Sequence, residues 1–139
     1  MRIYIIGPVR IATEGQASIQ ANYCAKMESE GHEVFLPQRD APQDSPTGYE
    51  IVEAELKAIS DADEVHVFWD ANSKGSHFDL GMAYALRKKI IMRHLFQPDT
   101  DGKSYVKVIK QRSSIAKGQR WSKKGELEED VAVVEGGLW

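Results

Sequence analysis

The sequence predicts a three-layer α/β fold with a parallel sheet, because two patterns recur along its 139 residues. Short apolar segments of strand length alternate with longer segments of helical length, which is the order of β-α-β units. The strand segments are almost continuously apolar, as in sheets that helices cover on both faces. Since crossovers between parallel strands are right-handed and the length suits one ordinary domain, we expect a single domain over residues 1–139.

The first part of the chain predicts two strands, one helix and a loop. The first strand covers residues 2–7, "RIYIIG", and a Gly-Pro pair ends it. A helix follows at residues 17–30 and ends at Gly31, a favoured residue at a helix C-terminus. The second strand covers residues 32–37. Residues 38–47 are rich in Pro, Asp and Ser, so we expect an exposed loop there.

The remaining elements continue the alternation, with weaker signals in the last forty residues. They are predicted as helix 48–62, strand 64–69, helix 77–88, strand 89–95, helix 103–116 and a short edge strand 131–134. The sheet then has about five strands. In such a sheet the binding cleft is expected outside the carboxyl ends of the strands.

Composition narrows the class of protein. A net charge of -3 gives no general attraction to nucleic acid or membrane, although residues 103–124 carry basic side chains and no acid. That stretch is interpreted as a solvated basic surface, with phosphate or polyanion binding as the alternative. The single cysteine, Cys24, excludes an internal disulfide and fits a reducing compartment. With no apolar segment long enough for a bilayer and a strand at the N-terminus, we predict a cytoplasmic protein.

Two carboxylates lie where apolar side chains are expected. Asp79 shares a helix face with Met82, Ala83 and Leu86, and Glu55 falls inside the apolar arc of the helix before it. A buried carboxylate is costly unless it is paired, hydrogen-bonded or protonated. Either residue alone fits a helix rim open to water, but two on successive helices against one sheet favour a site.

The two carboxylates are expected to differ in ionisation. Asp79, predicted in the first turn of its helix, gains from unpaired backbone N–H groups and should stay ionised as a nucleophile would. Glu55, mid-helix among aliphatic side chains, should have a raised pKa as an acid-base group would. Paired carboxylates about 5 Å apart are the equipment of retaining glycosyl chemistry.

A possible anion site precedes the helix that carries Asp79. The segment "SKGSHF", residues 73–78, supplies hydroxyls, a glycine and free N–H groups, although Ser76 also fits a plain N-cap. Arg10 would lie at the same sheet edge and hold a phosphate, or else be an ordinary surface arginine. No spacing of His, Cys and acids suggests a metal. The candidate binding residues are Arg10, Ser73, Gly75, Ser76 and His77.

Three segments together resemble a known family. They are "IYIIGPVR", "HEVFLP" and "AELKAISDADEVHVFWDANSKGSHFDLGMAYALRKKII", and they resemble the nucleoside 2-deoxyribosyltransferase-like family, including the deoxynucleoside 5'-monophosphate N-glycosidases. The likeness spans about residues 3–95. It implies a flavodoxin-like (Rossmann-like) fold, no metal or cofactor, and a homodimer or higher homo-oligomer in which a neighbouring subunit completes the site. A carboxylate of such enzymes attacks C1' of the nucleoside and releases the base, and the sugar passes to another base or to water.

The resemblance also implies roles for single residues. Asp79 stands at the position of the nucleophile, usually Glu, and Glu55 at that of an assisting carboxylate, usually Asp. Tyr4 matches the aromatic residue beneath the sugar, and Gly7 the glycine that lets the ligand approach the backbone. Asp at the nucleophile position is one methylene shorter and Glu55 one longer, so the pair looks exchanged.

Two further positions bear on the substrate. Arg10 and Ser73 match positions that hold the 5'-phosphate in the monophosphate hydrolases, whereas free-nucleoside transferases have an aspartate at the position of Ser73. A carboxylate there would repel a phosphate and a serine can donate to it, so the pair favours a monophosphate. The ending "EGGLW", residues 135–139, instead resembles the transferase branch.

The sequence therefore predicts an enzyme that cleaves the N-glycosidic bond of a (deoxy)nucleoside 5'-monophosphate. The partner is a small nucleoside or nucleotide, and neither a nucleic acid polymer nor a membrane is expected. Alternatives are exchange of bases on free deoxynucleosides, a non-catalytic nucleotide-binding protein of the same fold, and hydrolysis of a dinucleotide such as NAD.

Overall fold

The computed structural model describes residues 1–121, 123 and 127–128. The chain divides into two compact units, residues 1–98 and 99–139. The predicted extent of one domain over residues 1–139 stays a prediction. The first unit consists of β1 (Arg2–Ile6), α1 (Glu14–Ser29), β2 (Glu33–Phe35), α2 (Pro37–Asp40), α3 (Tyr49–Asp61), β3 (Glu64–Trp69), α4 (Lys74–Ala85) and β4 (Lys89–Leu95).

The sheet of the first unit confirms the predicted α/β class. Its four strands are all parallel and follow the order β2-β1-β3-β4. The chain leaves β1 toward β2 on one side and returns with β3 on the other, so the switch point of the topology lies between β1 and β3. Ligands of such sheets bind outside the carboxyl ends of these two strands.

The second unit contains α5 (Tyr105–Ala116) and a pair of two-residue antiparallel strands, β5 (Arg120–Trp121) and β6 (Leu127–Glu128). The helix lies within the segment predicted to be helical. Ser104 caps it, because its hydroxyl accepts a hydrogen bond from the backbone N–H of Lys107 at 3.1 Å. The predicted edge strand, 131–134, and the ending, 135–139, lie outside the described residues.

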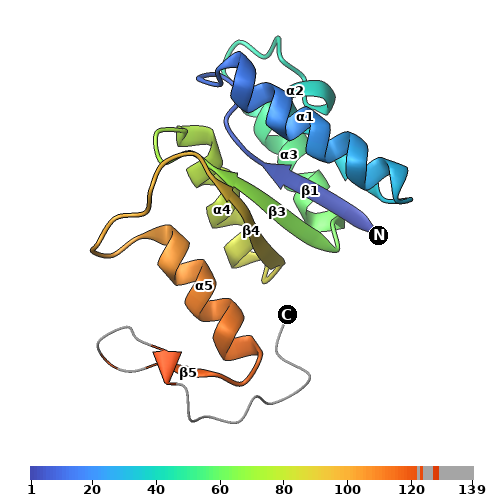
Figure 1. Cartoon of the computed structure of the whole chain (residues 1–139). Coiled ribbons are helices and arrows are strands. Elements are labelled where there is room, and N and C mark those ends of the chain that lie inside the picture. Colours follow the sequence, from blue (N-terminus) through green and yellow to red (C-terminus); the bar gives the residue numbers. More distant parts are fainter. Residues whose placement is uncertain (122, 124–126, 129–139) are drawn as a thin grey trace. The chain divides into compact units, whose positions relative to one another are not determined.

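Helices cover both faces of the sheet, as predicted (Figure 1). α1 lies on one face, where Ile3, Ile5 and Phe68 from the strands join Cys24 in a buried apolar cluster. α3 and α4 lie on the other face and contact β1 and one another. Because side chains of a strand alternate between faces, Tyr4 on β1 points toward α3 and α4.

Two helices begin three residues before their predicted starts. Thr13 caps α1: its hydroxyl accepts from the N–H of Gln16 at 3.1 Å, and its own N–H donates to the Gln16 side chain at 3.0 Å. α4 begins at Lys74, because the hydroxyl of Ser73 accepts a hydrogen bond from the N–H of Ser76. The earlier start places Asp79 in the second turn of α4, which corrects the prediction that it lies in the first.

The segment predicted as an exposed loop, 38–47, begins inside a short helix. Pro37 opens α2 at a position where its missing N–H is not needed. The carboxylate of Asp40 accepts from the backbone N–H of Leu36 at 2.9 Å and ties the turn together. Ala41, just after α2, is buried. The prediction of a fully exposed loop was therefore wrong at its first residues.

Gly7 is constrained by packing against α1. A Cβ at this position would overlap the side-chain amide of Gln20, which is buried and donates to the backbone oxygen of Pro8 at 2.9 Å. The glycine thus lets α1 approach the end of β1. This contact gives Gly7 a structural role in addition to the predicted approach of a ligand.

We expect Gly7→Ala to lower the free energy of unfolding by about 1–3 kcal/mol, because the added methyl must displace a buried, hydrogen-bonded amide. Urea denaturation followed by circular dichroism measures the change. Gly15→Ala is the matched control, since a Cβ at Gly15 meets its nearest atom only at 3.9 Å and the position is exposed. It should be neutral or stabilising by up to about 1 kcal/mol. Equal stabilities of Gly7→Ala and wild type would contradict the packing role.

Candidate active site

Three buried side chains from three elements meet on one face of the sheet. The hydroxyl of Tyr4 on β1 lies 2.9 Å from Oε2 of Glu55 on α3 and 2.8 Å from Oδ2 of Asp79 on α4. Tyr4 is 0% exposed, Glu55 9% and Asp79 6%. The two carboxylates that the sequence placed among apolar side chains are therefore brought together, and the tyrosine lies between them.

The ring of Tyr4 is held rigidly. It stacks on Phe35 of β2, its partner in the strand register, with ring centroids 5.4 Å apart and planes inclined by 12°. Burial raises the pKa of its hydroxyl well above 10.0, and the charges of Asp79 and Glu55 raise it further. Tyr4 consequently stays protonated at neutral pH and can donate.

Asp79 does not have the ionisation that the sequence predicted. Burial raises its pKa from 3.8 to about 8, the nearby charge of Glu55 contributes in the same direction, and the hydrogen bond from Tyr4 opposes them. The prediction of an ionised Asp79 assumed stabilisation by free N–H groups of a first helical turn. Because α4 starts at Lys74, those groups lie one turn away, and burial beside a second carboxyl decides the outcome.

The geometry of the three groups fixes how many protons they hold. A phenol has one proton and can donate it to only one of its two neighbours. If both carboxyls were ionised, the second contact would place two unprotonated oxygens against each other in a buried site. Both contacts are favourable when one carboxyl is protonated and donates to the phenol oxygen. The group therefore holds one carboxyl proton as well as the phenolic one, in agreement with the raised pKa of Asp79.

The start of α1 and the loop after β3 are joined at the carboxyl edge of the sheet. The side-chain amide of Gln16, in the first turn of α1, donates to Oδ2 of Asp70 at 2.9 Å. Oδ1 of the same residue accepts from the backbone N–H of Asn72 at 2.8 Å, and Asp70 is buried. Sequence reasoning did not single out Asp70. An aspartate directly after a buried strand was the available signal.

The hydroxyls of Ser73 and Ser76 form a short chain. Ser76 donates to Oγ of Ser73 at 2.9 Å through its hydroxyl and at 3.3 Å through its backbone N–H. Both serines are buried. Because Oγ of Ser73 accepts twice, its own proton is left to donate to a further acceptor. Ser76 acts on Ser73 and is not the N-cap that the sequence allowed it to be.

The other predicted binding residues have more varied surroundings. Arg10 is exposed in the loop after β1, and within the described residues it makes no ion pair. His77 uses Nδ1 to donate to the backbone oxygen of Ser73 at 2.7 Å, and its ring packs against Trp69 with centroids 4.6 Å apart. Gly75 is exposed, and a Cβ there would meet open space.

A separate hollow of about 690 Å³ lies along β2, and its lining includes none of the candidate catalytic or binding residues. Its charged side chains pair with one another: Arg2 with Glu33, Arg39 with Glu28 and Asp40, and Lys57 with Asp61. Paired charges leave little to attract a ligand there.

Within residues 1–121, 123 and 127–128, no group of His, Cys, Asp and Glu is arranged to hold a metal ion. Among the helices described, none has the length and apolarity needed to cross a membrane.

A buried carboxyl pair beside the switch point of a doubly wound sheet defines a class of α/β protein equipped for acid-base and nucleophilic chemistry. The family model of nucleoside 2-deoxyribosyltransferase matches residues 3–109. The chain therefore belongs to the nucleoside 2-deoxyribosyltransferase family, and it is a nucleoside-processing enzyme. This agrees with the resemblance in the sequence.

Solved structures show the same fold at low identity. A CMP N-glycosidase from Clostridium botulinum is 17% identical with a TM-score of 0.58, and the match covers 79% of this chain and 80% of that one. A 2-deoxyribosyltransferase from Bacillus psychrosaccharolyticus is 17% identical with a TM-score of 0.60, over 78% and 90% of the two chains. A conserved protein from Enterococcus faecalis V583 is 16% identical with a TM-score of 0.58, over 78% and 72%. A search of curated proteins finds no match.

The raised pKa of Asp79 predicts how stability depends on pH. The folded state holds a proton on this carboxyl between its ordinary pKa, 3.8, and about 8, whereas the unfolded chain loses it. Wild type should therefore lose stability as the pH rises through this window. The asparagine of Asp79→Asn does not titrate, so this loss is absent from the variant. As the pH rises, the free energy of unfolding of wild type should therefore fall relative to that of the variant by up to about 1.4 kcal/mol per pH unit. Urea denaturation at pH 5, 7 and 9 measures this, and parallel pH curves would contradict it.

Proposed function

We propose that the chain hydrolyses the N-glycosidic bond of (deoxy)nucleoside 5'-monophosphates. The observation that carries this is the pair of buried carboxyls, Glu55 and Asp79, on the shared hydroxyl of Tyr4. One ionised carboxylate and one stored proton are what cleavage at C1' requires: a nucleophile for the sugar and an acid for the departing base. In this proposal Asp79 attacks C1', Glu55 handles the proton, and Tyr4 positions the pair. No metal or cofactor takes part.

Ser73 and Arg10 support a monophosphate as the substrate. The hydroxyl of Ser73 accepts from Ser76 and keeps its own proton to donate, which suits an acceptor-only group such as a phosphate. Arg10, an exposed cation without an ion pair among the described residues, follows the neighbouring strand at the same edge. Gly75 and His77, in the first turn of α4, are the other residues proposed to contact the phosphate.

The enzyme should release free base and sugar phosphate when incubated with a panel of 2'-deoxy and ribonucleoside 5'-monophosphates. We expect kcat/KM at least about tenfold higher for the best monophosphate than for its nucleoside, since a charge-assisted contact contributes about 1.5–3 kcal/mol. Chromatography of base and sugar products measures both. Asp79→Asn should reduce base release by about 10³-fold or more, because an amide cannot attack C1'.

Asp61→Asn is the matched control for this substitution. Asp61 is an exposed carboxylate on α3 that pairs with Lys57 at 3.0 Å, and its loss should leave kcat unchanged.

Arg10→Ala should raise KM for the monophosphate about tenfold and leave KM for the nucleoside unchanged. Arg2→Ala, at the opposite end of β1, should change neither. A new nucleoside formed only when an acceptor base is supplied would instead identify a transferase. Binding of nucleotide with no base released would identify a non-catalytic protein.

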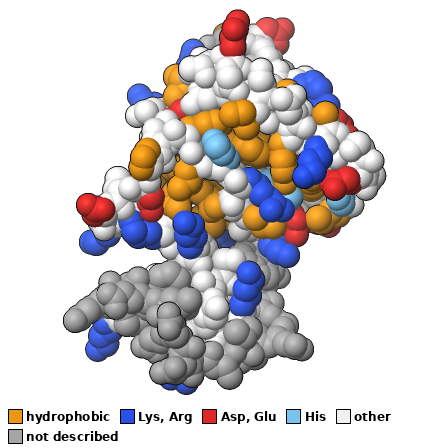
Figure 2. All heavy atoms as spheres, viewed as in Figure 1, with side chains coloured by type: hydrophobic (Ala, Val, Ile, Leu, Met, Phe, Trp, Pro, Cys, Tyr) orange, Lys and Arg blue, Asp and Glu red, His pale blue; other side chains and the backbone are white. Residues whose placement is uncertain are grey.

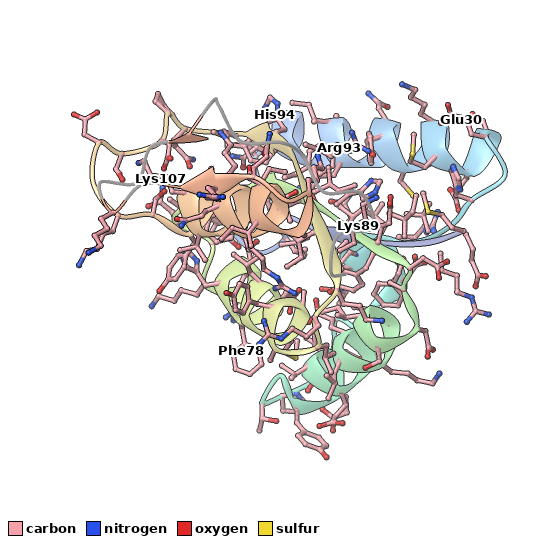
Figure 3. All side chains as sticks on the ribbon, turned by 90° about the horizontal axis from the view of Figure 1, so that it is seen from below. Glu30, Phe78, Lys89, Arg93, His94 and Lys107 are labelled. Atoms are coloured by element: carbon pink, nitrogen blue, oxygen red, sulfur yellow. The ribbon has the colours of Figure 1, made fainter. Side chains whose placement is uncertain are left out.

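We also propose that the enzyme is a homodimer or higher homo-oligomer with a shared active site. α4 exposes large apolar side chains: Phe78 is 57% exposed, and Leu86, directly after the helix, is 42% exposed. The exposure of Leu86 corrects the expectation that it shares the buried face of Asp79. The side chain of Phe78 projects away from the sheet (Figure 3). In Figure 2, which views the side of the sheet on which α1 lies, apolar side chains are exposed at the surface as well. Large exposed apolar side chains on one helix face favour a covering partner, and a second copy of the chain is the proposed cover.

Light scattering should give a mass of at least twice the 15.6 kDa of one chain. Phe78→Glu should shift it toward a single chain, because the interface would bury an unpaired charge. Ile19→Glu, a similarly exposed apolar residue on α1, is the matched control and should leave the mass unchanged. A monomeric wild type at assay concentrations would rule the proposal out.

A further inference from the structure

Asp79 has to change its ionisation before it can act as proposed. A neutral carboxylic acid is a poor nucleophile. The two contacts of the Tyr4 hydroxyl leave one of the two carboxyls protonated, and the raised pKa of Asp79 favours Asp79 as its holder. At neutral pH solvent does not take this proton, because burial beside Glu55 raises the pKa of Asp79 to about 8. The proton must therefore leave Asp79 through a partner within the site.

We propose that Tyr4 relays a proton between Asp79 and Glu55 and so converts Asp79 into the attacking carboxylate. The inference rests on the proposed function and adds a catalytic role for Tyr4 beyond positioning. Its geometric basis is the placement of one hydroxyl within hydrogen-bond distance of both carboxyls, at 2.8 and 2.9 Å.

The relay moves two protons and conserves charge. The proton of Asp79 passes to the oxygen of Tyr4, while the phenolic proton of Tyr4 passes to Oε2 of Glu55. Before the shift Asp79 and Tyr4 are neutral and Glu55 is an anion; after it Glu55 and Tyr4 are neutral and Asp79 is the anion. The net charge of the buried group is -1 throughout, so the step needs no new charge to be buried. Neither hydrogen bond is lost, because each reverses its direction.

The relayed proton then serves the leaving group. As the Asp79 carboxylate forms a bond to C1', the C1'–N bond breaks and its electron pair leaves with the base, which takes the proton of Glu55. Water then attacks C1' of the glycosyl ester and gives one proton to Glu55, and the bond between C1' and Asp79 breaks. The products are free base and sugar phosphate, and a reverse relay restores the resting state.

The surroundings of Tyr4 suit a relay better than a simple donor. Its hydroxyl stays protonated because burial holds its pKa far above neutrality, so the phenol carries no charge before or after the shift. Stacking on Phe35 fixes the ring between the two helices. In the described part of the chain, the titratable groups that act on Asp79 are Glu55 from α3 and Tyr4 from β1.

The test uses 4-nitrophenyl 2-deoxyriboside 5-phosphate, whose leaving group departs without a proton from the protein. The rate of the first turnover, seen as a burst of nitrophenolate, reports attack by Asp79 alone. With Tyr4→Phe the proton should stay on Asp79, so the burst at pH 6.5 should be at least about 100-fold slower than in wild type. At pH 9.5, where Asp79 loses its proton directly, the burst should recover to within about tenfold.

Glu55→Gln separates the two uses of the proton. With no second carboxylate, the pKa of Asp79 should fall, because the charge of Glu55 no longer raises it and Tyr4 donates to Asp79 alone. The nitrophenolate burst at pH 6.5 should therefore stay within about tenfold of wild type. Release of an ordinary base from a monophosphate should fall at least about 100-fold, because the acid is missing. Tyr49→Phe, at an exposed tyrosine, is the matched control and should leave both rates unchanged.

The outcomes distinguish the relay from the proposed function. No burst and no base from wild type would overturn both. An active wild type with Tyr4→Phe equally slow at pH 6.5 and 9.5 would leave Tyr4 a positioning residue and overturn the relay alone. A Tyr4→Phe burst as fast as wild type at pH 6.5 would mean that the proton passes directly between the carboxyls, and would also overturn the relay.

Discussion

The contact of one phenol with two buried carboxyls is the constraint around which the rest of the site is organised. Two carboxylates that share a dry site are costly when both are ionised, and a shared proton removes most of that cost. The fold supplies what the arrangement needs: a central strand for Tyr4, a helix on the same face for each carboxyl, and a stacked Phe35 that keeps the ring from turning. The sheet is assembled so that these parts lie beside the switch point of its topology.

Much of this site could be predicted because burial leaves a local signature. Glu55 and Asp79 stand on apolar helix faces, and an acid in such a place is visible in the sequence alone. The ionisation of Asp79 could not be predicted from the same pattern, because it depends on two facts of longer range. Ser73, and not a residue nearer to Asp79, starts α4, and Glu55 lies close enough for its charge to be felt. Both serines in "SKGSHF" fit an N-cap. Because Ser73 is the one that caps α4, the helix begins three residues earlier and Asp79 lies in its second turn.

Contacts between distant segments explain the other differences. Gly7 was assigned to ligand approach, and the structure adds the buried amide of Gln20 behind it. Asp70, in the loop after β3, accepts from Gln16 at the start of α1, a pairing across more than fifty positions that no periodicity reveals. Strands β1 to β4 were predictable because each contains a short, mainly apolar segment of strand length. α2 was not, because Pro and Asp are common in loops. Its helical turn is formed by backbone hydrogen bonds to Leu36 and Pro37, together with the bond from the N–H of Leu36 to Asp40.

The exchange of acid types between the two helices takes on a different meaning once Tyr4 is placed between them. The family resemblance puts Glu where Asp79 stands and Asp where Glu55 stands, so one side chain is shorter and the other longer by a methylene. Both carboxyls nevertheless reach the same hydroxyl, at 2.8 and 2.9 Å. A methylene moved from one helix to the other keeps the span between them, and with it the shared proton. What the exchange alters is the position of the attacking oxygen relative to the sugar. The sugar must therefore be bound at a correspondingly different position for Asp79 to reach C1'. In our proposal the contacts of the phosphate with Ser73 and Arg10 set that position.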